Sequence, residues 1–221
     1  MPVKAFLFDF DGLLVETESA SHAGWEWLYE RHGQELPPEK WALLVGTVDG
    51  WDIWGHLESL VGPLDRETLN EERYAHELTL LEAEQLRPGI VEYLDYAQQH
   101  ELKRALVSSA SRAWIDMHLT RLERTVGWDA IVTADLDKNR AKPQPTLYLE
   151  ALALLGVEAN DAVAFEDSPN GIVAAKAAGV FVVAVPNAIT RDLGLDHADL
   201  RVESLADLPP DQLLARLASP A

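Results

Sequence analysis

The sequence has no cysteine, and its 18 lysines and arginines are outnumbered by 37 aspartates and glutamates. Without cysteine, disulfide bonds and thiolate metal sites are excluded, and a reducing cytoplasm is the expected compartment. The net charge of −19 would repel nucleic acid and anionic lipid, so neither is an expected partner. A site for an anionic ligand would therefore need positive charge gathered locally.

Long apolar runs are missing as well. None approaches the length of a membrane span, and the start, MPVKAFLF, is too short for the apolar region of a signal peptide. The composition, 48% hydrophobic and 25% charged, is typical of a folded globular chain. Its 221 residues suit one large domain or a core with a smaller one, for which a monomer is adequate.

Strand and helix patterns alternate along most of the chain. Apolar strand patterns occur at residues 4–9, 104–108, 130–134, 162–166 and 180–185. Helical patterns occur at residues 89–100, 111–122, 145–156, 169–178 and about 210–217. Because strands separated by helices of this length form a parallel sheet, we predict an α/β fold with a Rossmann-like core, residues 1–15 and 88–221.

Residues 16–87 have a different pattern. Apolar residues recur there at helical spacings, interrupted by Pro37-Pro38 and by Gly62-Pro63. Five of the seven tryptophans lie in this segment, where we expect them to fill a small core. We predict four helices here, which form a small all-helical cap domain inserted after the first strand.

Polar residues follow several of the predicted strands. In an open parallel sheet, ligands bind beyond the carboxyl ends of the strands, so these residues are candidates for a functional site. They are Asp9, Asp11, Ser108, Ser109, Asp135, Asp137, Lys142, Glu166 and Asp167.

Two pairs of acidic residues are the main feature of this candidate site. Asp9 and Asp11 precede Gly12, which lets the backbone turn sharply, and Glu166 and Asp167 end a later strand. Taken alone, each pair could belong to a turn or a helix cap. Gathered at one place, their carboxylates would bind a cation, and hard oxygen ligands suit Mg²⁺.

Lys142 and Ser108 are the candidates for binding an anion. Lys142 lies in the stretch KPQP, and beside the acidic pairs it would neutralise a carboxylate and a bound phosphate together. The alternative for Lys142 is an ordinary solvated surface residue. Ser108 could donate its hydroxyl to an anion or cap the following helix, and the two roles are compatible.

Four motifs stand in a characteristic order. They are DFDG from Asp9, Ser108 after ALV, Lys142 in KPQP, and EDSPNGIVAAKAAG from Glu166. With the cap placed after the first strand, they resemble the haloacid dehalogenase superfamily of phosphotransferases. The resemblance is to the branch that includes β-phosphoglucomutase and many sugar-phosphate phosphatases, and it covers almost the whole chain.

The resemblance implies a role for each motif residue. Asp9 would be the nucleophile that forms an aspartyl-phosphate, and Asp11 would be the general acid and base. Ser108 would hold the transferred phosphoryl group, and Lys142 would neutralise it. Such positioning and charge neutralisation are what phosphoryl transfer requires. The second aspartate argues against dehalogenation, which needs no acid for the leaving group.

The resemblance also implies a set of metal ligands. Mg²⁺ would bind the side chain of Asp9, the backbone carbonyl of Asp11 and the side chain of Asp167. Glu166 would be a further ligand or a neighbour of one.

Substrate specificity is expected from the cap and from the segment after Ser108. The predicted contacts are Gly46, Thr47, Trp51, Ser109 and Arg112. The chain departs from its relatives at Asp49, which stands where the mutase carries an arginine that binds a second phosphate. A carboxylate there would repel a second phosphate, which favours a substrate with only one.

The predicted function is a Mg²⁺-dependent phosphatase of a small phosphorylated metabolite, a sugar or polyol phosphate. The alternative is a phosphohexomutase that uses a bisphosphate intermediate. A non-enzymatic phosphoacceptor resembling a response-regulator receiver is disfavoured, because receivers are much shorter and have no cap. A binding protein that has lost catalysis is disfavoured because every proposed catalytic residue is present.

Overall fold

A six-stranded parallel sheet forms the centre of the core. The computed structural model describes residues 2–41, 43–45, 50–125 and 127–218, and the sheet has the order β3-β2-β1-β4-β5-β6. The strands are β1 (Ala5–Phe8), β2 (Lys103–Ser108), β3 (Ala130–Thr133), β4 (Ala162–Glu166), β5 (Phe181–Ala184) and β6 (Leu200–Arg201). The predicted α/β fold with a parallel sheet is confirmed. The two-residue edge strand β6 was not predicted, because so short a strand leaves no periodic pattern.

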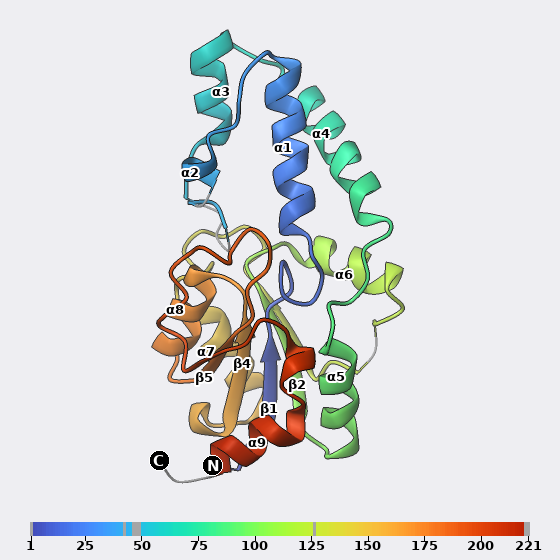
Figure 1. Ribbon diagram of the computed structural model, residues 1–221, viewed down its shortest axis with the longest axis vertical. Helices are drawn as coiled ribbons and strands as arrows, with labels where there is room; N and C mark the ends of the chain where they lie inside the picture. Colours follow the sequence, from blue (N-terminus) through green and yellow to red (C-terminus); the bar gives the residue numbers. More distant parts are fainter. Residues whose placement is uncertain (1, 42, 46–49, 126, 219–221) are drawn as a thin grey trace.

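Helices cover both faces of the sheet (Figure 1). Alternate side chains of β1 point to opposite faces, so Ala5 and Leu7 pack with α7 and α8, whereas Phe6 and Phe8 pack with α5, α6 and α9. The helices of the core are α5 (Ile90–Gln99), α6 (Arg112–Arg121), α7 (Thr146–Leu155), α8 (Pro169–Ala177) and α9 (Pro210–Ala218), with single 3₁₀ turns at Ala159–Asp161 and Leu205–Asp207.

In the described part of the chain, four further helices stand beyond the carboxyl ends of the strands (Figure 1), and we call them the cap. They are α1 (Glu18–Arg31), α2 (Pro38–Trp41), α3 (Ile53–Val61) and α4 (Arg66–Leu81). The number of helices agrees with the sequence prediction, while the domain bounds at residues 15–16 and 87–88 stay a prediction.

The cap has its own hydrophobic cluster. Trp25, Leu28, Trp41 and Leu57 are among its buried members, and α1 packs along α4. The Tyr29 hydroxyl donates a hydrogen bond to the Ile53 carbonyl at 2.9 Å, which fastens α1 to α3. Within the described part of the chain, none of the helices is long and apolar enough to cross a membrane.

Candidate active site

The chain turns sharply directly after β1, the strand between β2 and β4. Asp9 follows β1, and Gly12 adopts a left-handed conformation with φ +74°. A Cβ atom at Gly12 would lie 2.3 Å from Asp167 Oδ2 and 2.5 Å from Asn187 Nδ2. The site therefore needs glycine here for two reasons, the backbone conformation and the close approach of these two side chains.

Lys142 is buried at the centre of the site. Its side chain is 2% exposed, and its ammonium group pairs with Asp9 Oδ1 and, at 2.7 Å, with Glu166 Oε1. Burial alone would lower the pKa of Lys142, but the two carboxylates outweigh burial and raise the pKa above its ordinary value. The alternative of a solvated surface lysine is thereby excluded. Lys142 is the local positive charge that a chain of net charge −19 needs for an anionic ligand.

Three buried carboxylates form a candidate metal site. Asp9, Glu166 and Asp167 each offer an oxygen, and these oxygens lie within 4.8 Å of one another. Glu166 Oε2 is buried without a hydrogen-bond partner among the described residues. Burial and the neighbouring carboxylates raise the pKa of Asp167. Such a cluster fits a divalent cation, because the cation would compensate the buried negative charge. The side chain of Asp11 is outside this group, and its predicted ligation through the backbone carbonyl stays a prediction.

Asp11 is outside the three-carboxylate group and lines the pocket. Its Oδ1 accepts hydrogen bonds from Thr17 Oγ1 and Trp114 Nε1, both at 2.8 Å. Burial, and then the nearby charge of Asp9, raises the pKa of Asp11 to about 6, although these hydrogen bonds oppose the rise. A carboxyl group with such a pKa can exchange protons near neutral pH, as a general acid and base must.

Three serines near the site make different contacts. Ser108 is buried; its Oγ lies 3.4 Å from Asp11 Oδ2 and accepts a hydrogen bond from the Ala110 amide. The N-cap of α6 is Ser111 rather than Ser108. Ser168 caps α8, with Pro169 at the first helical position.

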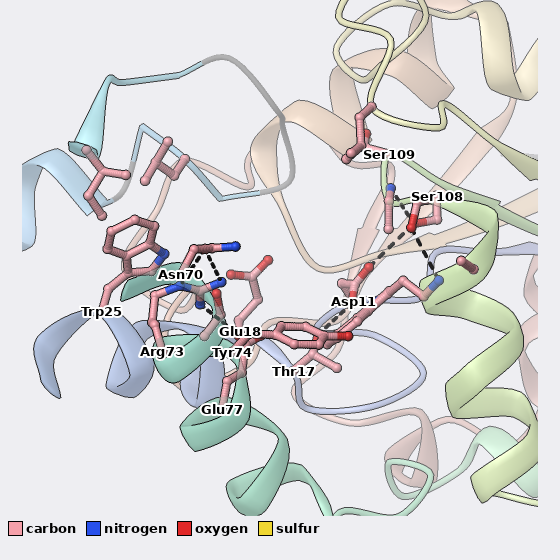
Figure 2. A pocket seen from close by; sticks show the side chains of 18 of the residues that line it. Asp11, Thr17, Glu18, Trp25, Asn70, Arg73, Tyr74, Glu77, Ser108 and Ser109 are labelled. Carbon is pink, nitrogen blue, oxygen red and sulfur yellow. Dashed lines mark hydrogen bonds and ion pairs between the residues drawn. The ribbon is translucent and has the colours of Figure 1, made fainter. Parts of the chain in front are cut away.

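A pocket of about 820 Å³ lies between core and cap. Figure 2 shows Asp11 and Ser108 on its core side and Asn70, Arg73 and Glu77 of α4 on its cap side. Asp9, Ser109 and Lys142 also line the core side, and Trp25, Trp41 and Trp51 line the cap side. Three tryptophans of the cap therefore face the pocket as well as packing in the cap.

The predicted substrate contacts have different placements. Trp51 and Ser109 line the pocket, as expected of substrate contacts. The exposed side chain of Arg112 pairs instead with Asp116 at 2.8 Å and is not among the pocket-lining residues. Gly46 and Thr47, together with Asp49, lie outside the described residues.

Helix α4 contributes residues that the sequence analysis missed. Arg73 and Glu77 form a buried ion pair, and Asn70 Oδ1 accepts from Arg73 at 3.3 Å. The guanidinium also lies 4.8 Å from the centre of the Trp25 ring. The spacing i, i+3, i+7 of these polar residues was a usable signal, because it places all three on one face of a helix.

Glu18 at the start of α1 was also missed. It lines the pocket between the cap residues and Asp11 (Figure 2). Burial, and then the charges of Asp11 and Asp9, raises the pKa of Glu18 to about 8. Glu18 can therefore present a protonated carboxyl group to a ligand at neutral pH.

Asn187 and Arg87 hold the loop that follows β1. Asn187 Nδ2 donates to Asp167 Oδ2 at 2.7 Å and to the Gly12 carbonyl at 3.3 Å. Arg87 donates to the same carbonyl and, at 2.7 Å, to the carbonyl of Pro186. No sequence motif singled out either residue, because their partners are distant in the chain.

The site that brings together two aspartates, a serine and a lysine lies in a chain whose sequence matches a known family. Residues 6–185 match the model of haloacid dehalogenase-like hydrolases. The chain belongs to this family. The resemblance drawn from the four motifs is thereby confirmed.

Two relatives match this haloacid dehalogenase-like hydrolase over nearly their whole length. A Bacillus subtilis protein named "Putative phosphatase YhcW" is 38% identical over 98% of this chain and 99% of its own. The validoxylamine A 7'-phosphate phosphatase of Streptomyces hygroscopicus subsp. limoneus is 32% identical over 93% of this chain and 95% of its own. This hydrolase is accordingly a phosphoric monoester hydrolase.

The fold has a close counterpart among solved structures. A haloacid dehalogenase family hydrolase of Deinococcus radiodurans R1, solved with bound phosphate and sodium, superposes with a TM-score of 0.78. It is 26% identical and covers 100% of this chain and 99% of its own. The fold of this chain is thus similar to that of the Deinococcus radiodurans hydrolase over its whole length.

Proposed function

We propose that this hydrolase removes phosphate from a small sugar or polyol phosphate, with Mg²⁺ as cofactor and through an aspartyl-phosphate on Asp9. The observation that carries the proposal is the meeting of Asp9, Asp11, Ser108 and Lys142 at one pocket beside a three-carboxylate cluster. Each group has the chemistry that its step requires.

Asp9 is the attacking group in the first step. Its carboxylate forms a bond to phosphorus while the bond from phosphorus to the alcohol oxygen breaks, and Asp11 gives its proton to that oxygen. Lys142 balances the negative charge on Asp9 and on the phosphoryl oxygens, and the Ser108 hydroxyl donates to one of them. In the second step Asp11 takes a proton from water, whose oxygen attacks the aspartyl-phosphate, and inorganic phosphate leaves.

The acidic cluster supports Mg²⁺ as the cofactor. Asp9, Glu166 and Asp167 offer only oxygen ligands, which Mg²⁺ prefers over softer donors. When bound, the ion would offset the charge of the carboxylates and of the phosphoryl oxygens.

The lining of the cap supports a leaving group that is neutral and rich in hydroxyl groups. Asn70, Glu18 and the Arg73–Glu77 pair offer donors and acceptors for hydroxyls, and the tryptophan rings suit the apolar face of a sugar. Arg73 has its charge already balanced by Glu77, so it is a poor site for a second phosphate. This favours hydrolysis of a monophosphate over the mutase alternative, which needs a bisphosphate.

A phosphate-release screen over phosphorylated metabolites tests the proposal. We expect release that stops with EDTA, returns with Mg²⁺, and falls by more than about a thousandfold in Asp9→Asn. Asp95→Asn, at an exposed position on α5, is the matched control and should keep full activity. Full activity of Asp9→Asn would refute the mechanism. An isomeric sugar phosphate formed without phosphate release would establish the mutase.

A further inference from the structure

The two carboxylate oxygens of Asp11 differ in their hydrogen-bond partners. Oδ1 accepts hydrogen bonds from Thr17 and from the indole of Trp114, both at 2.8 Å. Among the described residues, Oδ2 accepts one long hydrogen bond, from the Ser108 hydroxyl at 3.4 Å. The two oxygens can therefore have different roles. Trp114, which donates to Oδ1, lies outside all four sequence motifs.

An indole N–H can only donate a hydrogen bond, whereas a threonine hydroxyl can donate or accept. If Asp11 carried its proton on Oδ1, that proton would point at Thr17 or collide with the N–H of Trp114. With the indole in place, the proton belongs on Oδ2. This is the oxygen beside Ser108, where the phosphoryl group and its leaving oxygen are expected to lie.

The position of Trp114 is fixed from three sides. Its amide donates to the capping hydroxyl of Ser111 at 3.2 Å, which places it in the first turn of α6. Its ring meets the buried His118 ring edge to face, with centres 4.2 Å apart. Its other neighbour is Tyr74 of the cap, with ring centres 6.0 Å apart. The indole thus connects α4 of the cap to the carboxyl group of Asp11.

We propose that Trp114 is a positioning residue, which fixes the acidic proton of Asp11 on Oδ2 for delivery to the leaving oxygen. The proposal rests on the proposed function, in which Asp11 is the general acid. It assigns to Trp114 no contact with the reacting atoms. Loss of the N–H leaves Thr17 free to turn, so the proton can occupy either oxygen.

The test is Trp114→Phe, assayed on two substrates with different leaving groups. An alkyl phosphate, taken from the metabolites that the wild-type protein hydrolyses, needs a proton on its leaving oxygen. 4-Nitrophenyl phosphate does not, since its phenol leaves as an anion. We measure kcat/KM, because it covers the steps up to departure of the alcohol.

We expect kcat/KM for the alkyl phosphate to fall about tenfold, the worth of one hydrogen bond to a carboxyl group. For 4-nitrophenyl phosphate it should stay within about twofold. Trp128→Phe is the matched control, because its indole donates to the Arg124 carbonyl at 3.0 Å, away from Asp11. It should leave the ratio of the two values unchanged.

An equal fall for both substrates would show that the indole has only a structural role and would overturn the inference. Thr17→Val is the second variant. It removes the other donor to Oδ1 but keeps the indole, so the ratio should stay closer to the wild-type value than in Trp114→Phe. A fall as large as in Trp114→Phe, or an unchanged ratio in Trp114→Phe, also overturns the inference. Failure of the proposed function has a different outcome, since the wild-type protein would then release no phosphate from either substrate.

Discussion

Gly171→Ala should damage the carboxylate cluster although it changes no charged or polar side chain. Gly171 lies in the first turn of α8, directly over the carboxylate of Glu166. A Cβ atom at this position would lie 1.9 Å from Oε2 and 2.4 Å from Oε1 of Glu166, whereas ordinary contact begins at 3.4 Å. The carboxylate would have to move by about 1.5 Å, the difference between 1.9 and 3.4 Å.

Glu166 has no room for such a shift. It is fully buried, and Oε1 is bonded by Tyr148 and by Lys142, the latter at 2.7 Å. If both contacts are lost, the free energy of unfolding falls by about 3 kcal/mol, since hydrogen bonds to charged groups contribute about 1.5–3 kcal/mol each. For a chain of this size, that lowers Tm by about 6 °C or more. We also expect the Mg²⁺ concentration for half-maximal activity to rise about tenfold.

Urea titration and Mg²⁺-dependent phosphate release measure these two effects. Gly194→Ala is the matched control, because a Cβ atom there meets nothing within 4 Å and its φ is not left-handed. It should leave both quantities unchanged or raise stability slightly. If Gly171→Ala and Gly194→Ala behave alike in both assays, the packing argument for the cluster is wrong.

Three further outcomes follow from the geometry. The Arg112→Ala variant should keep KM within about twofold of the wild-type value, because the exposed ion pair of Arg112 with a neighbouring aspartate contributes little. A tenfold rise in KM would indicate instead that Arg112 contacts the substrate. Burial, and then a neighbouring arginine, lowers the pKa of His118 to about 4 from an ordinary value of 6.5. In that interval the unfolded chain binds the extra proton, so stability falls as pH drops from about 6.5 to 4, by about 3 kcal/mol. His118→Gln should remove this slope in urea titrations, and an unchanged slope would contradict it. Arg87→Met should cost about 2 kcal/mol of stability and lower kcat, because it frees the carbonyls of Gly12 and Pro186; wild-type values of both would show that the loop holds itself.

The sequence by itself determined the fold class and named the candidate reacting groups of this protein. The apolar run at β1 is buried on both faces of the sheet, and aspartates at the end of such a strand indicate a site beyond it. Proline and glycine at residues 37–38 and 62–63 marked breaks between the helical patterns of residues 16–87. Local physical rules sufficed here, because each signal is a periodicity or a neighbouring pair within a few residues.

Only the tertiary structure decided the ion pairs, the hydrogen bonds and the pKa shifts of those groups. Lys142 is 133 positions from Asp9, and the indole of Trp114 is 103 positions from Asp11, so no local pattern could pair them. The residues on the cap side of the pocket likewise could not be predicted from the sequence, because they depend on how α4 packs against α1 and the core. Arg112 looked like a substrate contact by its place after Ser108, yet the turn of α6 directs Trp114 to the site instead.

The physical reason is the range of the interactions involved. Backbone propensity and amphipathic pattern depend on residues that are close together in the chain, so both can be read from the sequence. Burial raises the pKa of Asp11, and it depends on what the rest of the chain packs around that carboxyl group. The sequence therefore named Asp11 as the candidate acid, and only the fold shows that its two oxygens have different hydrogen-bond partners.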